Sequence, residues 1–154
     1  MRIVLIYYSK TGKTRAVAQH IYEIIKSLGY DIEIYELRAK QEYAPYLLHL
    51  NLRLIYDTLI KGKVDIENIG IDVSKYDYLI LGSPIWYNTI VPIVKAFIEQ
   101  FKGKRIKTIY FTTSDLPANY SLKFKEELEK LGYKVLLHFN VIRGKLRQED
   151  KENS

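Results

Sequence analysis

The sequence predicts a single α/β domain with a parallel sheet and helices on both of its faces. Short apolar segments rich in β-branched residues alternate, from the first residues onward, with segments whose apolar residues recur at helical spacing. A chain of 154 residues, 47% of them hydrophobic, is long enough to bury one substantial core. We place the domain at residues 1–146 and expect a polar C-terminal tail at residues 147–154.

Five strands are predicted. The segment Arg2–Tyr8 is continuously apolar, which is typical of a strand buried on both faces. The next four strands are expected at Asp31–Leu37, Tyr78–Leu81, Lys107–Phe111 and Val135–Val141.

Three helices are predicted between these strands. The first presents Val17, Ile21 and Leu28 at helical spacing and ends at Gly29. Pro92 opens the second, because proline is favoured in the first turn of a helix. The third is expected at Asn119–Leu131.

Composition excludes several classes of protein. The chain has no cysteine, so disulfides, thiol nucleophiles and cysteine-ligated metal centres are excluded. No apolar run approaches the ~20 residues needed to span a bilayer, and the apolar N-terminal run is too short for a signal peptide. We therefore expect a cytoplasmic protein with no membrane association.

The net charge is +6, which favours acidic partners. The alternative is an ordinary solvated surface that carries a few extra lysines. The Lys102–Lys107 stretch is too short to indicate dedicated nucleic-acid binding.

The loop after the first strand is predicted to bind an anion. It joins a buried strand to the N-terminus of an amphipathic helix, where backbone amides and the helix dipole favour negative charge. Simple capping of the helix by a hydroxyl is the alternative, but it would need only one of the hydroxyls present. The residues of this predicted phosphate site are Ser9, Lys10, Thr11, Gly12, Lys13 and Thr14.

Two nucleotide-binding patterns do not fit this loop. Gly12-Lys13-Thr14 matches the end of a P-loop, but Tyr7 stands where its first glycine belongs. The strands that end at Leu81 and Phe111 are not followed by the acidic residue that a nucleotide hydrolase needs for magnesium. The GxGxxG fingerprint of dinucleotide-binding proteins is absent as well.

Ser9, Thr11, Gly12 and Thr14 resemble the phosphate loop of the flavodoxin family, S/T-x-T-G-x-T, at every defined position. The resemblance implies a flavodoxin-like doubly wound sheet of five parallel strands in the order 2-1-3-4-5, with helices on both faces. It also implies that these residues wrap the phosphate of non-covalently bound FMN.

The segment after the third strand also resembles this family. Gly82-Ser83-Pro84 and Trp86 are similar to its G-[ST]-P-x-[aromatic] loop, and the helix that starts at Pro92 is similar to its P-x-V-K-x-F helix. Adjacent aromatic residues at this edge of a sheet can stack on a flat cofactor, although Trp86 could instead plug the core. The cofactor-binding residues expected here are Ser83, Pro84, Ile85, Trp86, Tyr87 and Asn88.

The loop after the fourth strand is expected to close over the far edge of the flavin. Its short polar side chains can form hydrogen bonds to the pyrimidine end of the ring, and a plain turn into the next helix is the alternative. The residues concerned are Thr112, Thr113, Ser114 and Asp115.

The predicted function is FMN-dependent redox chemistry, either electron transfer or FMN-dependent reduction. The cofactor carries this chemistry, so no catalytic side chain and no metal are expected. The partner would be a redox protein or a small-molecule acceptor that is acidic or phosphorylated. The alternatives are a binding or regulatory module of the same fold without a cofactor, and a P-loop-like nucleotide hydrolase.

The segment Tyr43–Ile60 has apolar residues on more than one side of a predicted helix. Leu48, Leu52 and Ile55 form one stripe, whereas Leu50 lies on another flank. A second apolar flank needs cover, so we expect this helix to contribute to a homodimer interface or to roof the flavin site. The alternative is that residues 61–75 fold back over it.

Overall fold

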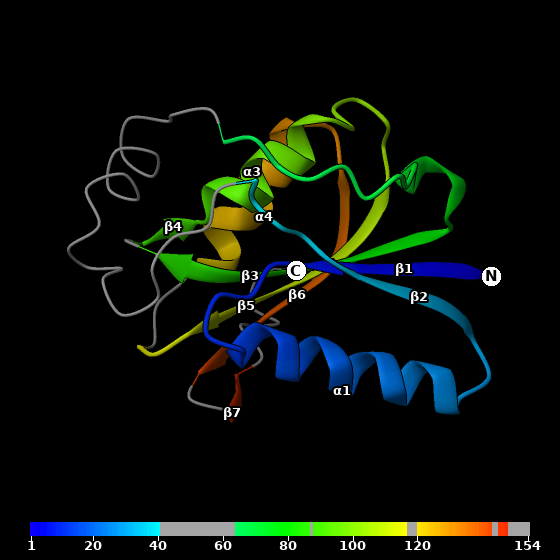
Figure 1. The fold of residues 1–154 in the computed structure, drawn as a ribbon, viewed down its shortest axis with the longest axis horizontal. Helices are drawn as coiled ribbons and strands as arrows, with labels where there is room; N and C mark the ends of the chain where they lie inside the picture. Colours follow the sequence, from blue (N-terminus) through cyan, green and yellow to red (C-terminus); the bar gives the residue numbers. More distant parts are fainter. Residues whose placement is uncertain (41–63, 87, 117–119, 143–144, 148–154) are drawn as a thin grey trace, which may run out of the picture.

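The computed structural model describes residues 1–40, 64–86, 88–116, 120–142 and the backbone of 145–147 (Figure 1). The predicted helix at Tyr43–Ile60 lies outside these residues, and so do Tyr87 and residues 148–154.

The five predicted parallel strands are present in one sheet. They run in the order β2-β1-β3-β5-β6, which is the predicted order 2-1-3-4-5 once the short strand β4 is counted in the numbering. The flavodoxin-like fold is therefore confirmed. The strand bounds are β1 (Arg2–Tyr7), β2 (Asp31–Glu36), β3 (Tyr78–Trp86), β5 (Lys107–Ser114) and β6 (Lys134–Ile142).

Two short antiparallel strands, which the sequence did not predict, extend this sheet. Strand β4 (Thr89–Ile90) folds back on the end of β3, so that Trp86 pairs with Thr89. Strand β7 (Lys145–Arg147) pairs with the end of β6. The polar composition of residues 145–147 concealed this strand, because backbone hydrogen bonds to β6 form whatever side chains they carry.

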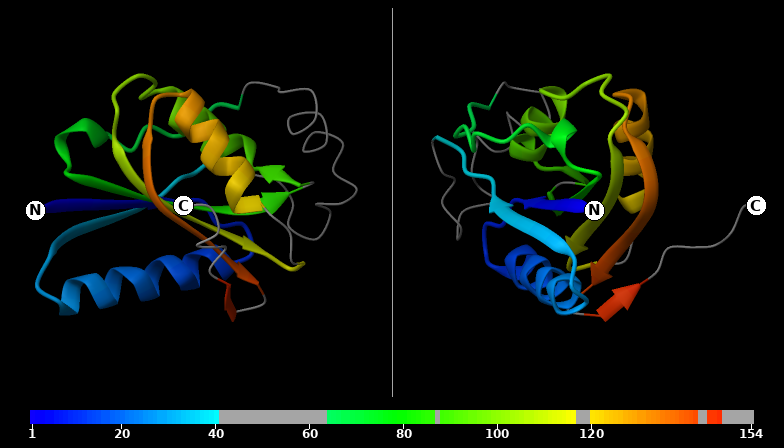
Figure 2. Two further views of the ribbon diagram at one scale, coloured as in Figure 1. Left: turned by 180° about the vertical axis from the view of Figure 1, so that it is seen from behind. Right: turned by 90° about the vertical axis from the view of Figure 1, so that its right-hand side faces the viewer.

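The helices cover the sheet from both sides, as Figure 2 shows. Helix α1 (Lys13–Ser27) lies on one face, and α3 (Pro92–Glu99) and α4 (Tyr120–Lys130) lie on the other. A single 3₁₀ turn, η2 (Val73–Lys75), leads into β3.

The core has two parts, one on each side of the sheet. In β1, Val4 and Ile6 pack toward α3 and α4, whereas Leu5 packs toward α1. Successive strand residues face opposite sides, so burial of both faces explains why β1 is continuously apolar.

Strands β3 and β5 are longer than the sequence indicated. Residues 82–86 were expected to be a loop, but Ser83 and Pro84 continue the ladder by pairing with Thr112 and Thr113 of β5. The predicted strands end where the apolar run ends, whereas backbone pairing continues beyond that point. The predicted loop residues therefore lie on the ends of strands, which hold them more rigidly than loops would.

Candidate functional site

The carboxyl ends of β1, β3 and β5 lie side by side at one edge of the sheet (Figure 1). Each of the three predicted site segments follows or forms one of these ends. The fold therefore brings together the phosphate loop, the aromatic segment and the polar end of β5. We call this region the carboxyl edge.

The phosphate loop presents an open helix N-terminus. Gly12 is the N-cap of α1 and has φ 95° and ψ −8°, a left-handed conformation that glycine adopts without strain. No side chain caps the helix. The Ser9 hydroxyl instead accepts a hydrogen bond from the Gly12 amide at 3.1 Å. The hydroxyls therefore do not serve as caps, and the amides of the first turn remain available to an anion.

Two contacts attach this loop to the end of β5. The hydroxyls of Thr14 and Thr113 are hydrogen-bonded at 2.8 Å, and both residues are buried. Above them, Lys13 Nζ donates to Asp115 Oδ1 at 2.5 Å, and both of these side chains are exposed. Residues that are about a hundred positions apart in sequence thus form one wall of the site.

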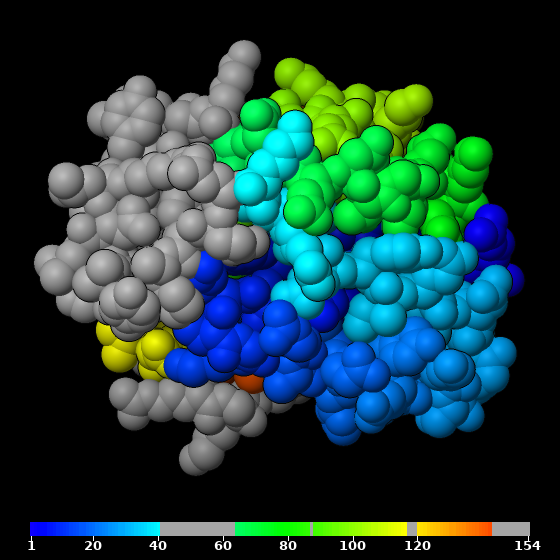
Figure 3. Space-filling view, in the orientation of Figure 1, coloured from blue at the N-terminus to red at the C-terminus, as the bar shows by residue number. Residues whose placement is uncertain are grey.

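A second cation beside the loop, Arg15 of α1, is paired with a carboxylate of β2. The Arg15 guanidinium donates to both carboxylate oxygens of Glu36, at 2.6 and 3.1 Å, and the Tyr7 hydroxyl donates to the same carboxylate at 3.3 Å. Its hydrogen bonds to Glu36 raise the pKa of Arg15, and burial followed by the Glu36 charge raises the pKa of Tyr7. Helix α1 and strand β2 lie side by side on the face shown in Figure 3. Much of the positive charge that the sequence places at this loop is therefore neutralised locally.

The aromatic segment forms a β-hairpin. Trp86 is half-buried, and its ring contacts Tyr8 edge-on, with centroids 5.7 Å apart and planes at 84°. Asn88, at the tip, has φ 59°, which asparagine tolerates better than most residues. Tyr120 of α4 donates to Asn88 Oδ1 at 3.2 Å, and Lys123 donates to the Asn88 carbonyl at 3.4 Å. Two side chains of α4 therefore fix the tip of the hairpin.

The base of the hairpin is packed inside the sheet. Ser83 is fully buried, and its hydroxyl donates to the Pro84 carbonyl at 2.8 Å. A Cβ added to Gly82 would lie 2.3 Å from the Phe111 ring, so glycine is required at that position for packing. Pro84 and Ile85 are half-buried beside Trp86. Of these residues, Ser83 supports the site from below rather than lining it.

The end of β5 carries a polar network. Thr112 donates to Asn140 Oδ1 at 2.9 Å, and Asn140 Nδ2 donates to Ser114 Oγ at 3.1 Å. Ser114 in turn donates to the Leu116 carbonyl at 2.9 Å. Thr112 and Asn140 are fully buried, so they position the loop, whereas Ser114 and Asp115 lie closer to the surface.

Sequence reasoning missed three residues that shape the site: Tyr8, Tyr120 and Asn140. Asn140 could have been noticed in the sequence, because it is a polar residue inside the otherwise largely apolar strand Val135–Val141. Nothing in the sequence connects Tyr120 with Asn88, because their contact depends on how α4 packs against the hairpin.

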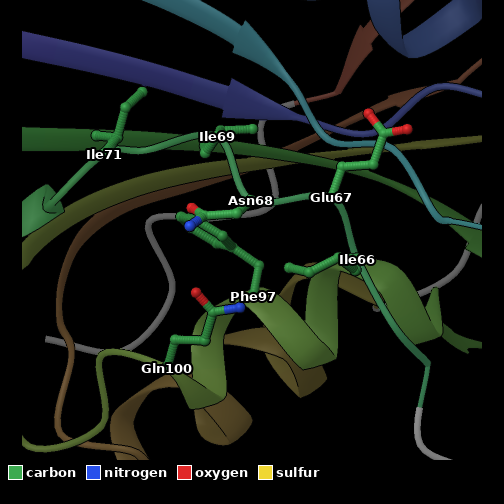
Figure 4. A pocket seen from close by; sticks show the side chains of 7 residues that line it. All are labelled: Ile66, Glu67, Asn68, Ile69, Ile71, Phe97 and Gln100. Carbon is green, nitrogen blue, oxygen red and sulfur yellow. The ribbon is translucent and has the colours of Figure 1, made fainter.

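A separate cavity of about 270 Å³ lies between residues 66–71 and α3 (Figure 4). None of its lining residues belongs to the predicted site. They are Ile66, Glu67, Asn68, Ile69, Ile71, Phe97 and Gln100.

Two further properties concern only the described part of the chain. None of its helices has the length and apolar character needed to cross a lipid bilayer. None of its histidine and acidic side chains form a group of three or more that could hold a metal ion.

The family model described as NADPH-dependent FMN reductase matches residues 1–114 of the chain. This range contains the first two segments of the carboxyl edge and all of the third except Asp115. No curated protein matches the chain.

Several solved structures share the fold. A flavoprotein of Lactobacillus acidophilus NCFM in complex with FMN has 22% sequence identity and a TM-score of 0.74, and the match covers 90% of this chain and 92% of that one. The apo form of the flavoprotein from the same organism has 24% identity and a TM-score of 0.68, with 90% and 91% covered. The two-electron reduced flavodoxin of Megasphaera elsdenii has 20% identity and a TM-score of 0.59, with 90% and 84% covered.

Proposed function

Because the chain belongs to the NADPH-dependent FMN reductase family, we propose that it binds FMN non-covalently at the carboxyl edge and uses it to reduce an acceptor. The observation that carries this proposal is the uncapped N-terminus of α1, with Gly12 in the left-handed conformation and Trp86 on the neighbouring strand end. An open anion site beside an aromatic hairpin suits a ligand that joins a phosphate to a flat ring.

The residues present fit the two ends of FMN. The first-turn amides of α1 and the exposed Thr11 hydroxyl would hold the phosphate. Trp86 would cover the ring, because the edge-on contact with Tyr8 supports it from one side and its side chain is only partly buried. Ser114, the last residue of β5, would border the flavin ring, and Asp115, which follows it, lies beside the phosphate loop.

FMN, when bound, supplies the transfer of one or two electrons. The chain supplies binding, orientation and exclusion of water. The buried Thr14–Thr113 contact fixes the phosphate loop relative to β5, and the contacts of Tyr120 and Lys123 with Asn88 fix the hairpin relative to α4. The site is therefore largely formed before the cofactor arrives.

A titration tests the binding part of this proposal. We expect the purified protein either to carry flavin or to quench the fluorescence of added FMN with a saturating curve. Protein that neither contains flavin nor quenches FMN would instead support a binding or regulatory module without a cofactor.

A second experiment separates reduction from electron transfer. We expect anaerobic addition of NADPH to bleach the visible absorbance of the bound flavin, with NADH as the matched comparison. Flavin that neither nucleotide reduces, but that exchanges electrons after chemical reduction, would support an electron carrier instead.

The acceptor or partner is proposed to be acidic or phosphorylated, as the net charge of +6 indicates. Salt should then slow its association, because screening weakens attraction between exposed charges. Rates that do not change with ionic strength would contradict this proposal. We also propose the homodimer predicted from the Tyr43–Ile60 segment, which light scattering tests directly.

A further inference from the structure

We propose that Lys13 favours FMN over flavins that lack a phosphate, and that Asp115 opposes this preference because it holds Lys13 until a phosphate replaces it. The inference rests on the proposed FMN site. In the free protein Lys13 is paired with Asp115. In the complex, Lys13 would exchange that carboxylate for the phosphate at the same end of α1.

The position of Lys13 supports this exchange. Lys13 is the first residue of α1 and directly follows Gly12, so its side chain starts beside the open amides of the first turn. Asp115 directly follows β5 and reaches the same place from the other side. The Asp115 carboxylate is therefore paired with Lys13 at the end of the helix where a phosphate would bind.

The Lys13–Asp115 pair is suited to exchange. Its side chains are 62% and 66% exposed, and exposed ion pairs contribute little to stability. The buried hydroxyl contact joins Thr14, the residue after Lys13 in α1, to Thr113 of β5, which lies two residues before Asp115. The backbone can therefore stay in place while the two charged side chains separate.

The neighbouring Arg15–Glu36 pair is not suited to exchange. Arg15 binds Glu36 through two hydrogen bonds, the Glu36 side chain is only 20% exposed, and Tyr7 donates to the same carboxylate. Releasing Arg15 would leave a partly buried carboxylate with one partner fewer. Of these two cations, Lys13 can therefore leave its carboxylate and pair with a phosphate more easily than Arg15.

The effect should depend on the charge of the ligand. A phosphate monoester carries about −1.5 to −2 charges at neutral pH, so it competes well with a single carboxylate for a lysine. Riboflavin shares the flavin ring but has no phosphate. Removing the Asp115 charge should thus help FMN and leave riboflavin unaffected.

The experiment measures the Kd of FMN and of riboflavin by fluorescence quenching for the wild type and four variants. The variants are Asp115→Asn, Lys13→Met, the combination of the two, and Glu126→Gln, which removes an exposed negative charge elsewhere. Circular dichroism confirms that each variant is folded. For FMN we expect Asp115→Asn to bind about 1.5- to fivefold more tightly and Lys13→Met to bind less tightly by a similar factor, which is the size expected for exposed charge pairs.

Three further results are expected. The double variant should resemble Lys13→Met, because Asp115 acts through Lys13. Glu126→Gln should resemble the wild type. The gain from Asp115→Asn should shrink as the salt concentration rises from about 10 mM to about 1 M, because the screening length falls from ~30 Å to ~3 Å over this range.

Several results would overturn the proposal. Unchanged FMN affinity in Asp115→Asn would show that the pair does not limit phosphate binding. Equal changes for FMN and riboflavin would show that Asp115 contacts the flavin ring. If the wild type binds FMN, the proposed function stands whatever Asp115 does; if it does not bind FMN, the proposed function and this inference fail together.

Discussion

The two edges of the sheet differ in whether their basic side chains form ion pairs. At the carboxyl edge, Lys13 and Arg15 are each paired with a carboxylate from another element. At the amino edge, the turns and strand starts before β3, β5 and β6 carry exposed basic side chains that form no ion pair with the described residues. These are Lys75, Lys102, Lys104, Arg105, Lys107, Lys130 and Lys134.

The fold itself gathers these cations at the amino edge. Lys107 and Lys134 are register partners on adjacent strands, an arrangement that places like charges side by side. The turns at Gly103 and Gly132 pack against each other, joined by a hydrogen bond from the Gly103 amide to the Leu131 carbonyl at 2.8 Å. Among the described residues, a cluster of exposed cations without ion pairs therefore lies at the amino edge, away from the proposed flavin site. The net charge of a sequence does not predict at which edge of the sheet the charged side chains will lie.

The largest effect on the carboxyl edge is expected from Trp86→Ala. Loss of a stacked aromatic ring costs about 1–3 kcal/mol, so FMN affinity should fall by about tenfold to a hundredfold. The midpoint potential of the bound flavin should rise, because a stacked ring disfavours the added charge of the reduced state. Fluorescence titration and potentiometry measure the two effects.

The fold should survive this substitution, because Trp86 is only partly buried at the end of β3 and packs against the core without being one of its buried residues. Phe97→Ala is the matched control, because Phe97 is fully buried and its truncation should unfold or strongly destabilise the domain by about 3–5 kcal/mol. If Trp86→Ala unfolds the domain as Phe97→Ala does, Trp86 is a core residue and the stacking proposal is wrong.

The two ends of α1 offer a sharper comparison. Gly12 and Gly29 have φ 95° and 84°, and a Cβ at either would meet nothing within 4 Å. Alanine at either position should therefore cost a similar strain of about 1–2 kcal/mol, measured by denaturant unfolding. Only Gly12→Ala should also weaken FMN binding, by about tenfold, because it alone disturbs the first-turn amides. Equal FMN affinity in the two variants would place the phosphate elsewhere.

Much of this edge could be predicted from the sequence. The apolar run of β1, the glycine and hydroxyls after it, and the lone tryptophan after β3 each carry a local signal, and a parallel sheet brings such segments to one edge. The fold and the general position of the site follow from these signals.

The partners of the site residues could not be predicted. Lys13 and Asp115 are 102 residues apart, and Tyr120 and Asn88 are 32 apart. Such contacts depend on the packing of whole elements and leave no local pattern. For the same reason the ends of β3 and β5 were placed too early, because their pairing depends on the neighbouring backbone rather than on side-chain polarity.

A smaller effect concerns the cations of the two edges during electron transfer. Ferricyanide, a small anion, should oxidise the chemically reduced protein about two- to threefold faster in Asp115→Asn than in the wild type, because loss of the exposed Asp115 carboxylate makes the surface beside the flavin less negative. Lys104→Gln, at the amino edge, should leave the rate unchanged. Stopped-flow measurement at low salt checks both results. A slower reaction in Lys104→Gln would show that the amino edge influences the site after all.

The smallest effect concerns Glu33 of β2 and the stability of the folded protein in acid. Hydrogen bonds from the Tyr35 and Tyr76 hydroxyls, at 2.6 and 2.7 Å, lower the pKa of Glu33 below its ordinary value of 4.5. A carboxylate with a lowered folded-state pKa stabilises the protein above its unfolded-state pKa, and this contribution is lost as pH falls through the folded-state value. Glu33→Gln should therefore be less stable than the wild type at pH 7, and the gap should narrow as pH falls below about 4.5. Denaturant midpoints measured across this pH range test the prediction.

Glu126→Gln, which removes an exposed carboxylate that has no hydrogen bond to the described residues, should show no such narrowing. A gap that stays constant with pH would mean that Glu33 stabilises β2 through packing rather than through its charge.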